Sequence, residues 1–451
     1  GNCSLQKLAN DLDILNVPFK EEYEDQEWNM DFPLIRDAKK CIKCMRCVQV
    51  CNKIQGMKVW DIINTGKRTN VGLREGTSIE DINCALCGQC ITHCPVGALR
   101  ERDDLNELVY AIADKKKVVV AQIAPAVRAA WGERFGLKRE DATVKRLVAA
   151  LRRTGIDYVF DTNFTADLTI MEEANEFIER LKNKDKYKFP MFTSCCPGWV
   201  RFVKYEYPEL LPNLSTAKSP QQMFGAVVRE YYKDPEKNEG KKIVSVSIMP
   251  CTAKKEEILR PESYTNGKQD VDYVLTTTEI VRMIRKSGIV FDKVEIEAAD
   301  VPFGIGSGSG VIFGVTGGVT EAVLRRLSPD HSKEAMHEIA ECGVRGEEGI
   351  KEFTVPYKGM DINVCVASGL ANARTVMERV KNGEANYHLI EVMACRRGCI
   401  MGGGQPTRSG DRTKAARARG LYNADNTMII KKSDENPLVL ELYEGLLKGK
   451  E

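Results

Sequence analysis

Half of the sixteen cysteines in this chain form two runs with the same spacing, C-x2-C-x2-C-x3-C. The runs are Cys41, Cys44, Cys47, Cys51 and Cys84, Cys87, Cys90, Cys94. In such a run the first three cysteines can bind three corners of an iron–sulfur cubane, while the fourth points toward a second cluster. The spacing therefore predicts two [4Fe–4S] clusters that exchange their fourth ligands. The two ligand sets are Cys41, Cys44, Cys47, Cys94 and Cys84, Cys87, Cys90, Cys51.

Structural zinc is the alternative interpretation of these runs. Zinc sites usually combine paired C-x-x-C segments, or cysteines with regularly spaced histidines. Neither run has a histidine at such a spacing, and we regard His93 as incidental. Pro95 completes the ferredoxin form C-x2-C-x2-C-x3-C-P, although Asn52 stands at the matching place after the first run. We therefore expect electron-transfer clusters rather than zinc.

Five further cysteines are spread over the rest of the chain, and each follows an apolar run typical of a strand. They are Cys195, Cys196, Cys251, Cys395 and Cys399. Ligands at the carboxyl ends of strands gather at one edge of an open α/β sheet, so these cysteines are candidate ligands of one metal centre. The i, i+4 spacing of the last two predicts that they share a face of a helical turn, and the glycines that follow let backbone approach a bulky group.

Adjacent side chains diverge in extended backbone, so only one of Cys195 and Cys196 can face a shared centre, and the other stays a free thiol. The ordinary alternative for a single cysteine is burial in the core. Burial suits Cys3, Cys342 and Cys365. It does not suit the five cysteines above, because glycine or proline flanks each of their segments.

Strand and helix patterns alternate from Leu105 onward, which predicts an α/β architecture with largely parallel sheets covered by helices. The predicted strands are 118–123, 156–160, 189–192, 243–249, 271–275, 362–367 and 389–393, and the predicted helices are 142–153, 166–181, 278–286 and 371–380. We expect four segments. They are an N-terminal extension (1–40) packed on the next module, a ferredoxin-like domain (41–105), a catalytic domain (106–406) and a C-terminal wrapping segment (407–451) whose end, 438–447, is amphipathic.

Composition excludes several classes of partner. Charged residues make up 29% of the chain and nearly cancel to +2, so no basic surface for nucleic acid or for a membrane is expected. The longest apolar stretches are far shorter than a membrane span. The segment 1–10 lacks the apolar core of a signal peptide. Together with the cysteine content, these features lead us to expect a reduced, cytoplasmic protein.

The three segments around the scattered cysteines resemble the signature motifs of [FeFe]-hydrogenases. They are TSCCPGW (193–199), MPCTAKKEE (249–257) and EVMACRRGCIMGGGQP (391–406). The resemblance extends from residue 41 to 451. It implies a catalytic domain of two lobes, with mixed or parallel sheets and flanking helices around a buried H-cluster, next to a small α+β ferredoxin-like domain with two clusters. The implied reaction is 2H⁺ + 2e⁻ ⇌ H₂, with ferredoxin or flavodoxin as the electron carrier and maturation proteins that deliver part of the cofactor.

The resemblance also implies roles for individual residues. Cys196, Cys251, Cys395 and Cys399 would hold a [4Fe–4S] cubane, with Cys399 bridging to a two-iron subsite that carries CO, CN⁻ and azadithiolate. Cys195 would pass protons, and Lys254 would pair with a cyanide. The implied proton path continues through Glu173, Glu176, Ser215 and Arg180. Residues implied to surround the subsite are Ala124, Pro125, Gln221, Met249, Phe313 and Met393. Without the resemblance, the stripe of Glu173, Glu176 and Arg180 at i, i+3 and i+7 would indicate a solvated helix face.

Several positions depart from the family pattern. Arg396, Arg397 and Met401 stand where small residues and Asn are common, and Ala126 replaces a hydroxyl residue. Because cluster potentials respond to charge and hydrogen bonding, we expect an altered catalytic bias rather than loss of the reaction. Two alternatives remain: a hydrogen sensor of low turnover, and a non-catalytic iron–sulfur assembly relative. Retention of Cys195, Lys254 and the acidic path argues against both.

Overall fold

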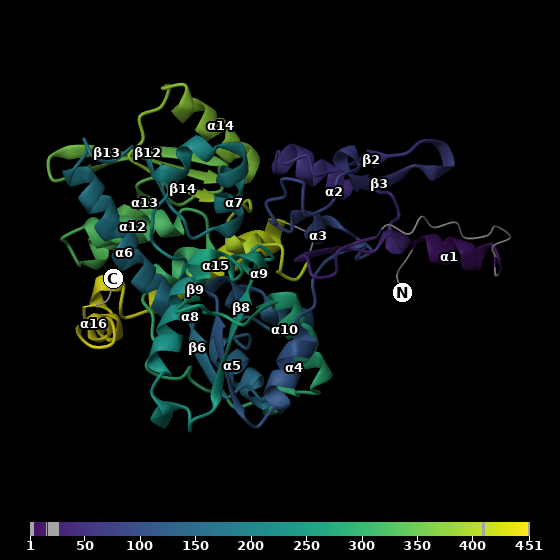
Figure 1. The fold of residues 1–451 in the computed structure, drawn as a ribbon, viewed down its shortest axis with the longest axis horizontal. Helices are drawn as coiled ribbons and strands as arrows, with labels where there is room; N and C mark the ends of the chain where they lie inside the picture. Colours follow the sequence, from purple (N-terminus) through teal and green to yellow (C-terminus); the bar gives the residue numbers. More distant parts are fainter. Residues whose placement is uncertain (1–3, 15, 17–26, 408–410, 450–451) are drawn as a thin grey trace.

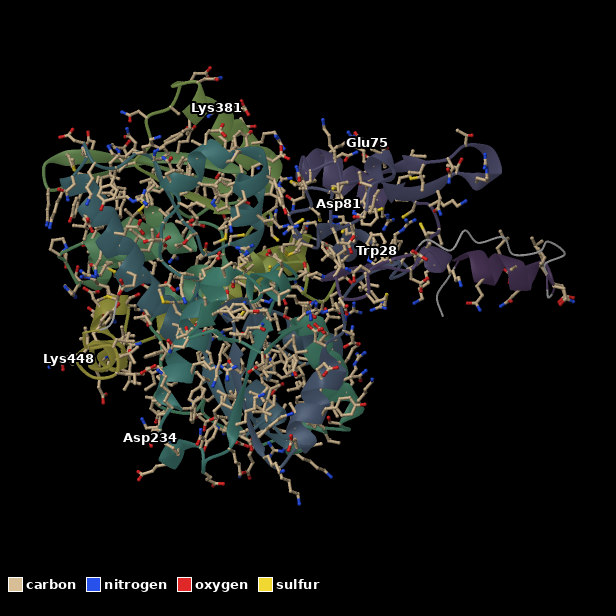
Figure 2. All side chains as sticks on the ribbon, in the orientation of Figure 1. Trp28, Glu75, Asp81, Asp234, Lys381 and Lys448 are labelled. Atoms are coloured by element: carbon tan, nitrogen blue, oxygen red, sulfur yellow. The ribbon has the colours of Figure 1, made fainter. Side chains whose placement is uncertain are left out.

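The computed structural model describes residues 4–14, 16, 27–407 and 411–449. Cys3 and the acidic stretch 21–24 lie outside these ranges. Figure 1 shows two lobes, each built on a sheet, with a smaller accessory unit at one side of them. Lys381 on one lobe and Asp234 on the other lie at opposite ends of the molecule (Figure 2). None of the helices in the described ranges has the length and apolar character needed to span a bilayer.

The first lobe contains a four-stranded parallel sheet in the order β11-β8-β5-β6. Its strands are β5 (Lys117–Ile123), β6 (Tyr158–Asp161), β8 (Lys242–Met249) and β11 (Tyr273–Thr276). After Lys242 every residue of β8 is buried, as expected for a strand covered on both faces. The helices of this lobe are α4 (Leu105–Ala113), α5 (Val144–Arg153), α8 (Pro220–Tyr231) and α10 (Thr277–Lys286).

The second lobe contains a mixed sheet in the order β12-β13-β14-β7. Its strands are β7 (Met191–Phe192), β12 (Ile350–Tyr357), β13 (Met360–Ser368) and β14 (Leu389–Met393), and its helices are α7 (Pro197–Glu206), α12 (Gly318–Leu327), α13 (Lys333–Glu341) and α14 (Leu370–Lys381). The pairs β13–β14 and β14–β7 are parallel, whereas β12 pairs with β13 as an antiparallel hairpin. The sequence did not predict β12, because half-exposed residues alternate along this edge strand.

Helix α6 (Thr162–Lys182) begins four residues earlier than the sequence predicted. Asp161 caps it, because its Oδ1 accepts a hydrogen bond of 3.0 Å from the backbone N–H of Asn163. The same carboxylate forms an ion pair of 2.7 Å with Arg128. The cap fixes the start of the helix that carries the predicted proton-path residues.

The accessory unit combines short helices with two small antiparallel ribbons. Its elements are β1 (Leu34–Arg36), α2 (Arg46–Gln49), the π-helix η2 (Val50–Ile54), β2 (Trp60–Ile63), β3 (Asn70–Leu73), α3 (Gln89–His93) and β4 (Leu99–Glu101). Strand β1 pairs with β4, although it lies in the segment expected to be an extension. We therefore propose that this unit begins near Leu34 rather than at Cys41.

The segment before β1 is only partly packed on the accessory unit. Trp28 stacks on Trp60, with ring centroids 5.9 Å apart, as an extension packed on the next module should. Helix α1 (Ser4–Asp11), which the sequence did not predict, instead points away from the lobes (Figure 1).

The C-terminal segment contains α15 (Asp411–Thr427), which lies between the two lobes, and α16 (Pro437–Glu444) at one side of the molecule (Figure 1). Arg417 of α15 is buried and forms an ion pair of 2.7 Å with Glu133. Its guanidinium also donates to the carbonyl oxygens of Ile400 and Pro406, each at 2.8 Å. In α16, Val439 and Leu442 are buried in a hydrophobic cluster with residues of β5, α6 and α8.

Candidate active site

One apolar cavity lies where the strands of both lobes end. Cys195 and Cys196 follow β7 and Cys395 follows β14 in one sheet, whereas Cys251 follows β8 in the other. The strand ends of two sheets, rather than the edge of one sheet that the sequence predicted, therefore face the same cavity. The empty space between the walls measures about 830 Å³. The sequence-predicted residues that line it are Ala124, Pro125, Cys195, Cys196, Gln221, Met249, Cys251, Lys254, Phe313, Met393, Cys395 and Cys399.

Cys395 and Cys399 reach the cavity by a different backbone from the helical turn that the sequence predicted. The chain turns sharply between them, with positive φ at Arg397 (68°) and Gly398 (84°), and a short 3₁₀ helix begins at Cys399. The helical expectation is therefore wrong. A Cβ on Gly398 would lie 2.7 Å from the backbone of Thr316, so glycine is required there for space as well as for φ.

The donors in this cavity fit an iron–sulfur group. Burial raises the pKa of Cys251 to about 11, and it raises the pKa of Cys395 and of Cys399 as well. Buried thiols of this kind become stable thiolates when a metal cation binds them. Cys196 Sγ accepts a hydrogen bond from the backbone N–H of Ala394 at 3.4 Å, a contact that also suits a metal-bound sulfur.

Lys254 places a buried ammonium on the cavity wall. Its Nζ lies 2.8 Å from Oε2 of Glu257, 2.8 Å from Oγ of Ser219 and 3.3 Å from the carbonyl oxygen of Cys195. The same carboxylate of Glu257 accepts a hydrogen bond of 2.9 Å from Nε2 of Gln221. The carboxylate thus compensates the buried cation, and the cation stays at the surface of the cavity.

Gln221 presents an unpartnered acceptor to the same cavity. Its Oε1 is buried and has no hydrogen-bond partner among the residues that the structure describes. Its backbone carbonyl accepts from Nε2 of Gln122, which also donates to Oγ of Ser247 at 2.7 Å. Hydrogen bonds hold both the backbone and the Nε2 of Gln221, and its Oε1 remains as an acceptor for a polar group bound in the cavity.

Glu173 is a fully buried carboxyl group beside the cavity. Desolvation raises its pKa to about 8, although the backbone N–H of Ser194, at 3.4 Å from Oε1, opposes the shift. Its other oxygen, Oε2, has no hydrogen-bond partner within 3.5 Å in the described part of the chain. The pKa of the Cys195 thiol is raised too, first by burial and next by the charge of Glu173. A protonatable acid and a free thiol are therefore electrostatic neighbours.

Glu176 connects this region to the surface. It lies one turn further along α6 and forms an ion pair of 2.6 Å with Arg180. Its Oε2 accepts a hydrogen bond of 2.7 Å from Oγ of Ser215 and one of 2.9 Å from the backbone N–H of Thr216, which is exposed. The helix stripe is therefore not a solvated face, because Glu173 and Arg180 are both buried.

The accessory unit contains two smaller cavities lined by cysteine. Cys41, Cys44, Cys47 and Cys94 line one, and Cys51, Cys84, Cys87 and Cys90 line the other. These are the two exchanged sets that the sequence predicted. Their empty volumes, about 400 and 390 Å³, are less than half that of the main cavity. In the described ranges no group of three or more His, Cys, Asp or Glu side chains is placed to hold a single metal ion.

Shared walls join the three cavities in series. Trp60 lines both accessory cavities, and Cys87 lines the second accessory cavity and the main cavity. Cys87 O lies 3.8 Å from Sγ of Cys395, so the second cavity and the main one are separated by little more than backbone. Such a series is suited to electron transfer.

The positions that depart from the family pattern differ in their surroundings. Arg397 forms an ion pair of 2.7 Å with Glu347, and its backbone N–H donates to Oγ of Ser368. Arg396 is exposed, and its Cγ lies near Gly369. Ala126 lines the main cavity, as its place in the motif implies.

Sequence reasoning missed three polar residues around the cavity. Glu257 carries the signal of an i, i+3 pair with Lys254. Glu391 is buried in β14 and accepts hydrogen bonds of 2.7 Å from the backbone N–H groups of Gly317 and Thr320, a contact with no local signal. Gln89 lies within the second cysteine run and donates to Cys395 across 306 residues of sequence.

Comparison with protein families gives three matches along the chain. Residues 117–403 match the model of the iron only hydrogenase large subunit, C-terminal domain. Residues 33–100 match the ferredoxin-like domain of NADH-quinone oxidoreductase subunit 3, and residues 411–451 match the iron hydrogenase small subunit.

Known proteins resemble the chain over most of its length. The NADP-reducing hydrogenase subunit HndD of Solidesulfovibrio fructosivorans is 43% identical over 99% of this chain and 77% of its own. Iron hydrogenase 1 of Clostridium pasteurianum is 42% identical over 98% and 78%. A solved [FeFe]-hydrogenase, HydA1 from Chlamydomonas reinhardtii, is 37% identical over 77% of this chain and 95% of that one, with a TM-score of 0.66. More distantly, a cytosolic Fe-S cluster assembly factor of Xenopus tropicalis is 30% identical over 82% of this chain and 80% of its own.

Proposed function

The chain belongs to the iron-only, or [FeFe], hydrogenase family, and from this premise we propose that it catalyses the reversible reaction 2H⁺ + 2e⁻ ⇌ H₂. It is an oxidoreductase of H₂ metabolism, and its cofactors are those of the family, an H-cluster and [4Fe–4S] clusters. One observation carries the proposal: Cys195, Cys196, Cys251, Cys395 and Cys399 meet around a single apolar cavity that also exposes Lys254.

We assign the ligands among these five thiols by their places in the family motifs. Cys196, Cys251, Cys395 and Cys399 would hold the cubane of the H-cluster, and the two-iron subsite would lie on the Cys399 side of the same cavity. When bound, this group supplies a Lewis-acidic iron and a basic amine that together split H₂. The protein contributes the walls: Phe313, Met249 and Met393 exclude water from the cavity. Lys254 would place its positive charge on the cavity wall, where it favours an anionic group such as a cyanide.

The proton path runs along α6. Cys195 takes the proton at Sγ and passes it to Oε2 of Glu173, whose raised pKa lets this carboxyl hold a proton near neutral pH. The proton then moves by way of Ser215 Oγ to Glu176. Arg180 holds the Glu176 carboxylate in place, and the neighbouring Thr216 is at the surface.

Electrons travel the other way through the accessory unit, whose eight run cysteines we assign to two [4Fe–4S] clusters. The electrons pass Cys87 and Trp60, which each line two neighbouring cavities, and they leave the protein near Cys44, which is exposed. The segment that contains Cys44 carries six exposed basic side chains. They are Lys39, Lys40, Lys43, Arg46, Lys53 and Lys58. Asp37 is the one acidic residue in the segment 37–58. This surface favours an acidic carrier such as ferredoxin or flavodoxin.

We further propose a cytoplasmic location and delivery of the two-iron subsite by maturation proteins. The cysteines that we assign to clusters have to be reduced when the clusters are inserted, and a cytoplasm keeps thiols reduced.

The two arginines after Cys395, Arg396 and Arg397, are proposed to alter the catalytic bias. Arg396→Gln should lower the reduction potential of the cubane more than Arg397→Gln, because Glu347 already pairs with Arg397. Equal potentials in both variants and the wild type would refute this.

One experiment separates the proposal from its two alternatives. The protein is matured with the two-iron subsite beside a known hydrogenase as a positive control, and infrared bands of CO and CN⁻ are recorded with H₂ turnover. Bands with turnover support the enzyme. Bands with negligible turnover favour the sensor, and absent bands favour the assembly relative. In Cys195→Ala turnover should fall by roughly 10²–10⁴-fold with the bands retained.

A further inference from the structure

Gln89 of the accessory unit contacts a thiol of the main cavity directly. Its Nε2 lies 3.2 Å from Sγ of Cys395 and 3.0 Å from the carbonyl oxygen of Met401. Gln89 is buried at the first position of α3, in the run that also supplies Cys87 and Cys90. The contact therefore joins the ligand loops of two different clusters.

The orientation of the Gln89 amide follows from its second partner. The carbonyl of Met401 can only accept, so the amide nitrogen must face it. One N–H of this nitrogen is donated to the carbonyl of Met401, and the second N–H is directed at the sulfur of Cys395. The reversed amide would set its oxygen against both a carbonyl oxygen and a sulfur, without a donor for either. The sulfur therefore accepts a hydrogen bond from a side chain.

Two glycines hold the accessory unit close enough for this contact. A Cβ on Gly88 would lie 2.7 Å from Cα of Gly403, and a Cβ on Gly403 would lie 2.5 Å from Cα of Gly88. The glycine run after Cys399 was expected to let backbone approach a bulky group. At Gly403 it instead lets two backbones meet, next to Gln89 and Cys395. The distance between the donor and the sulfur is thus fixed by main-chain packing.

We propose that Gln89 is a positioning residue through which the accessory unit tunes the reduction potential of the catalytic cubane. The inference rests on the proposed role of Cys395 as a cubane ligand. Reduction adds negative charge to the cubane and its thiolates, so an N–H donor stabilises the reduced state more than the oxidised one. Gln89 therefore raises the potential of the catalytic cubane, and the accessory unit does more than conduct electrons to it.

The test compares two buried glutamines of the accessory unit in the matured protein. Gln89→Met keeps the side-chain length and removes the donor. Gln55→Met is the matched control, because Oε1 of Gln55 accepts from the backbone N–H of Leu370 in the catalytic lobe but contacts no catalytic thiol. Midpoint potentials of the cubane are measured by infrared and electron paramagnetic resonance titration. We expect Gln89→Met to shift the oxidised-to-reduced ratio about tenfold, a potential lower by about 59 mV. Gln55→Met should leave the catalytic cubane at the wild-type potential.

A second variant separates tuning from loss of structure. Gln89→Glu keeps the shape and replaces the donor with a carboxylate, and it should lower the potential at least as far. If both Gln89 variants bind the full complement of iron and their catalytic cubane keeps the wild-type potential, the inference is wrong. Equal shifts in Gln55→Met and Gln89→Met would also overturn it, because domain contact alone would then account for them. A wild type that shows no catalytic cubane signal overturns the proposed function itself.

Discussion

Ser215 Oγ donates a hydrogen bond of 2.7 Å to Oε2 of Glu176. This contact joins the loop before α8 to the middle of α6, and the ion pair with Arg180 fixes the carboxylate from its other side. Glu176→Gln should keep the shape of the contact but remove the proton acceptor. We expect turnover of H₂ to fall about 10²-fold or more, with unchanged CO and CN⁻ bands. Glu179→Gln, an exposed neighbour on α6, is the control and should retain activity. Full activity in Glu176→Gln would exclude this path.

The buried carboxyl of Glu173 should titrate near pH 8. Its pKa is raised because burial disfavours the carboxylate, so the protonated form persists at neutral pH and is lost as the pH rises through about 8. An infrared titration should show a carboxylic acid band at pH 6 that disappears above pH 8. The band should be missing from Glu173→Gln. A wild-type band that disappears near the ordinary glutamate pKa of 4.5 would contradict the assignment.

Arg397 adopts a left-handed backbone conformation that suits glycine. A side chain in this region costs roughly 1 kcal/mol, whereas glycine adopts it freely. Arg397→Gly and Arg397→Ala both remove the ion pair with Glu347, so their difference isolates the backbone. We expect the glycine variant to be about 1 kcal/mol more stable in thermal unfolding of the iron-loaded protein. At most other positions alanine is the more stabilising of the two, so the reverse order would show that Arg397 is not left-handed.

The buried guanidinium of Arg417 should be needed to hold the C-terminal segment. Arg417→Met leaves the carboxylate of Glu133 and two carbonyl oxygens without their donor. We expect a loss of about 3 kcal/mol in the free energy of unfolding, together with faster proteolysis of α15. Arg419→Met, a substitution on the same helix, is the control. Unchanged cleavage of α15 in Arg417→Met would contradict the role.

Basic residues around Cys44 should recruit the electron carrier. Lys43→Glu with Arg46→Glu reverses two exposed charges near this cysteine. The KM for an acidic ferredoxin should rise about tenfold or more and become less sensitive to salt, while turnover with a small neutral dye is retained. Lys448→Glu, on the opposite side of the molecule (Figure 2), serves as the control. An unchanged KM would show that the carrier docks elsewhere.

Much of the site could be predicted because local sequence determines it. The apolar runs before Cys195, Cys251 and Cys395 are strands, and the neighbouring parallel strands β7 and β14 bring Cys195 and Cys395 to the same sheet edge. The sequence did not show that Cys251 reaches this place from a second sheet. The exchanged cysteine sets follow from a spacing that admits few geometries. The α/β class and the two lobes are confirmed for the same reason, since strand and helix periodicities are local properties.

The rest depends on contacts that no local pattern encodes. Gln89 reaches Cys395 only because Gly88 and Gly403 allow two distant backbones to touch. The i, i+4 spacing of Cys395 and Cys399 fits a helix as well as the observed turn, so the spacing cannot distinguish them. The positive φ of Arg397 cannot be predicted either, because nothing in the sequence marks an arginine in this conformation. Hairpin strand β12 was missed because its half-exposed residues resemble a loop.

The proposed ligands come from both lobes, and this has a mechanical consequence. Cys251 follows a strand of one sheet, whereas Cys196, Cys395 and Cys399 belong to segments of the other. A group bound to all of them is a cross-link between two bodies whose chain segments are far apart in sequence. As with a disulfide that closes a long loop, such a link reduces the entropy of the unfolded chain. Iron loading would therefore also fasten the two lobes together, and the protein would be most deformable before its cofactor arrives.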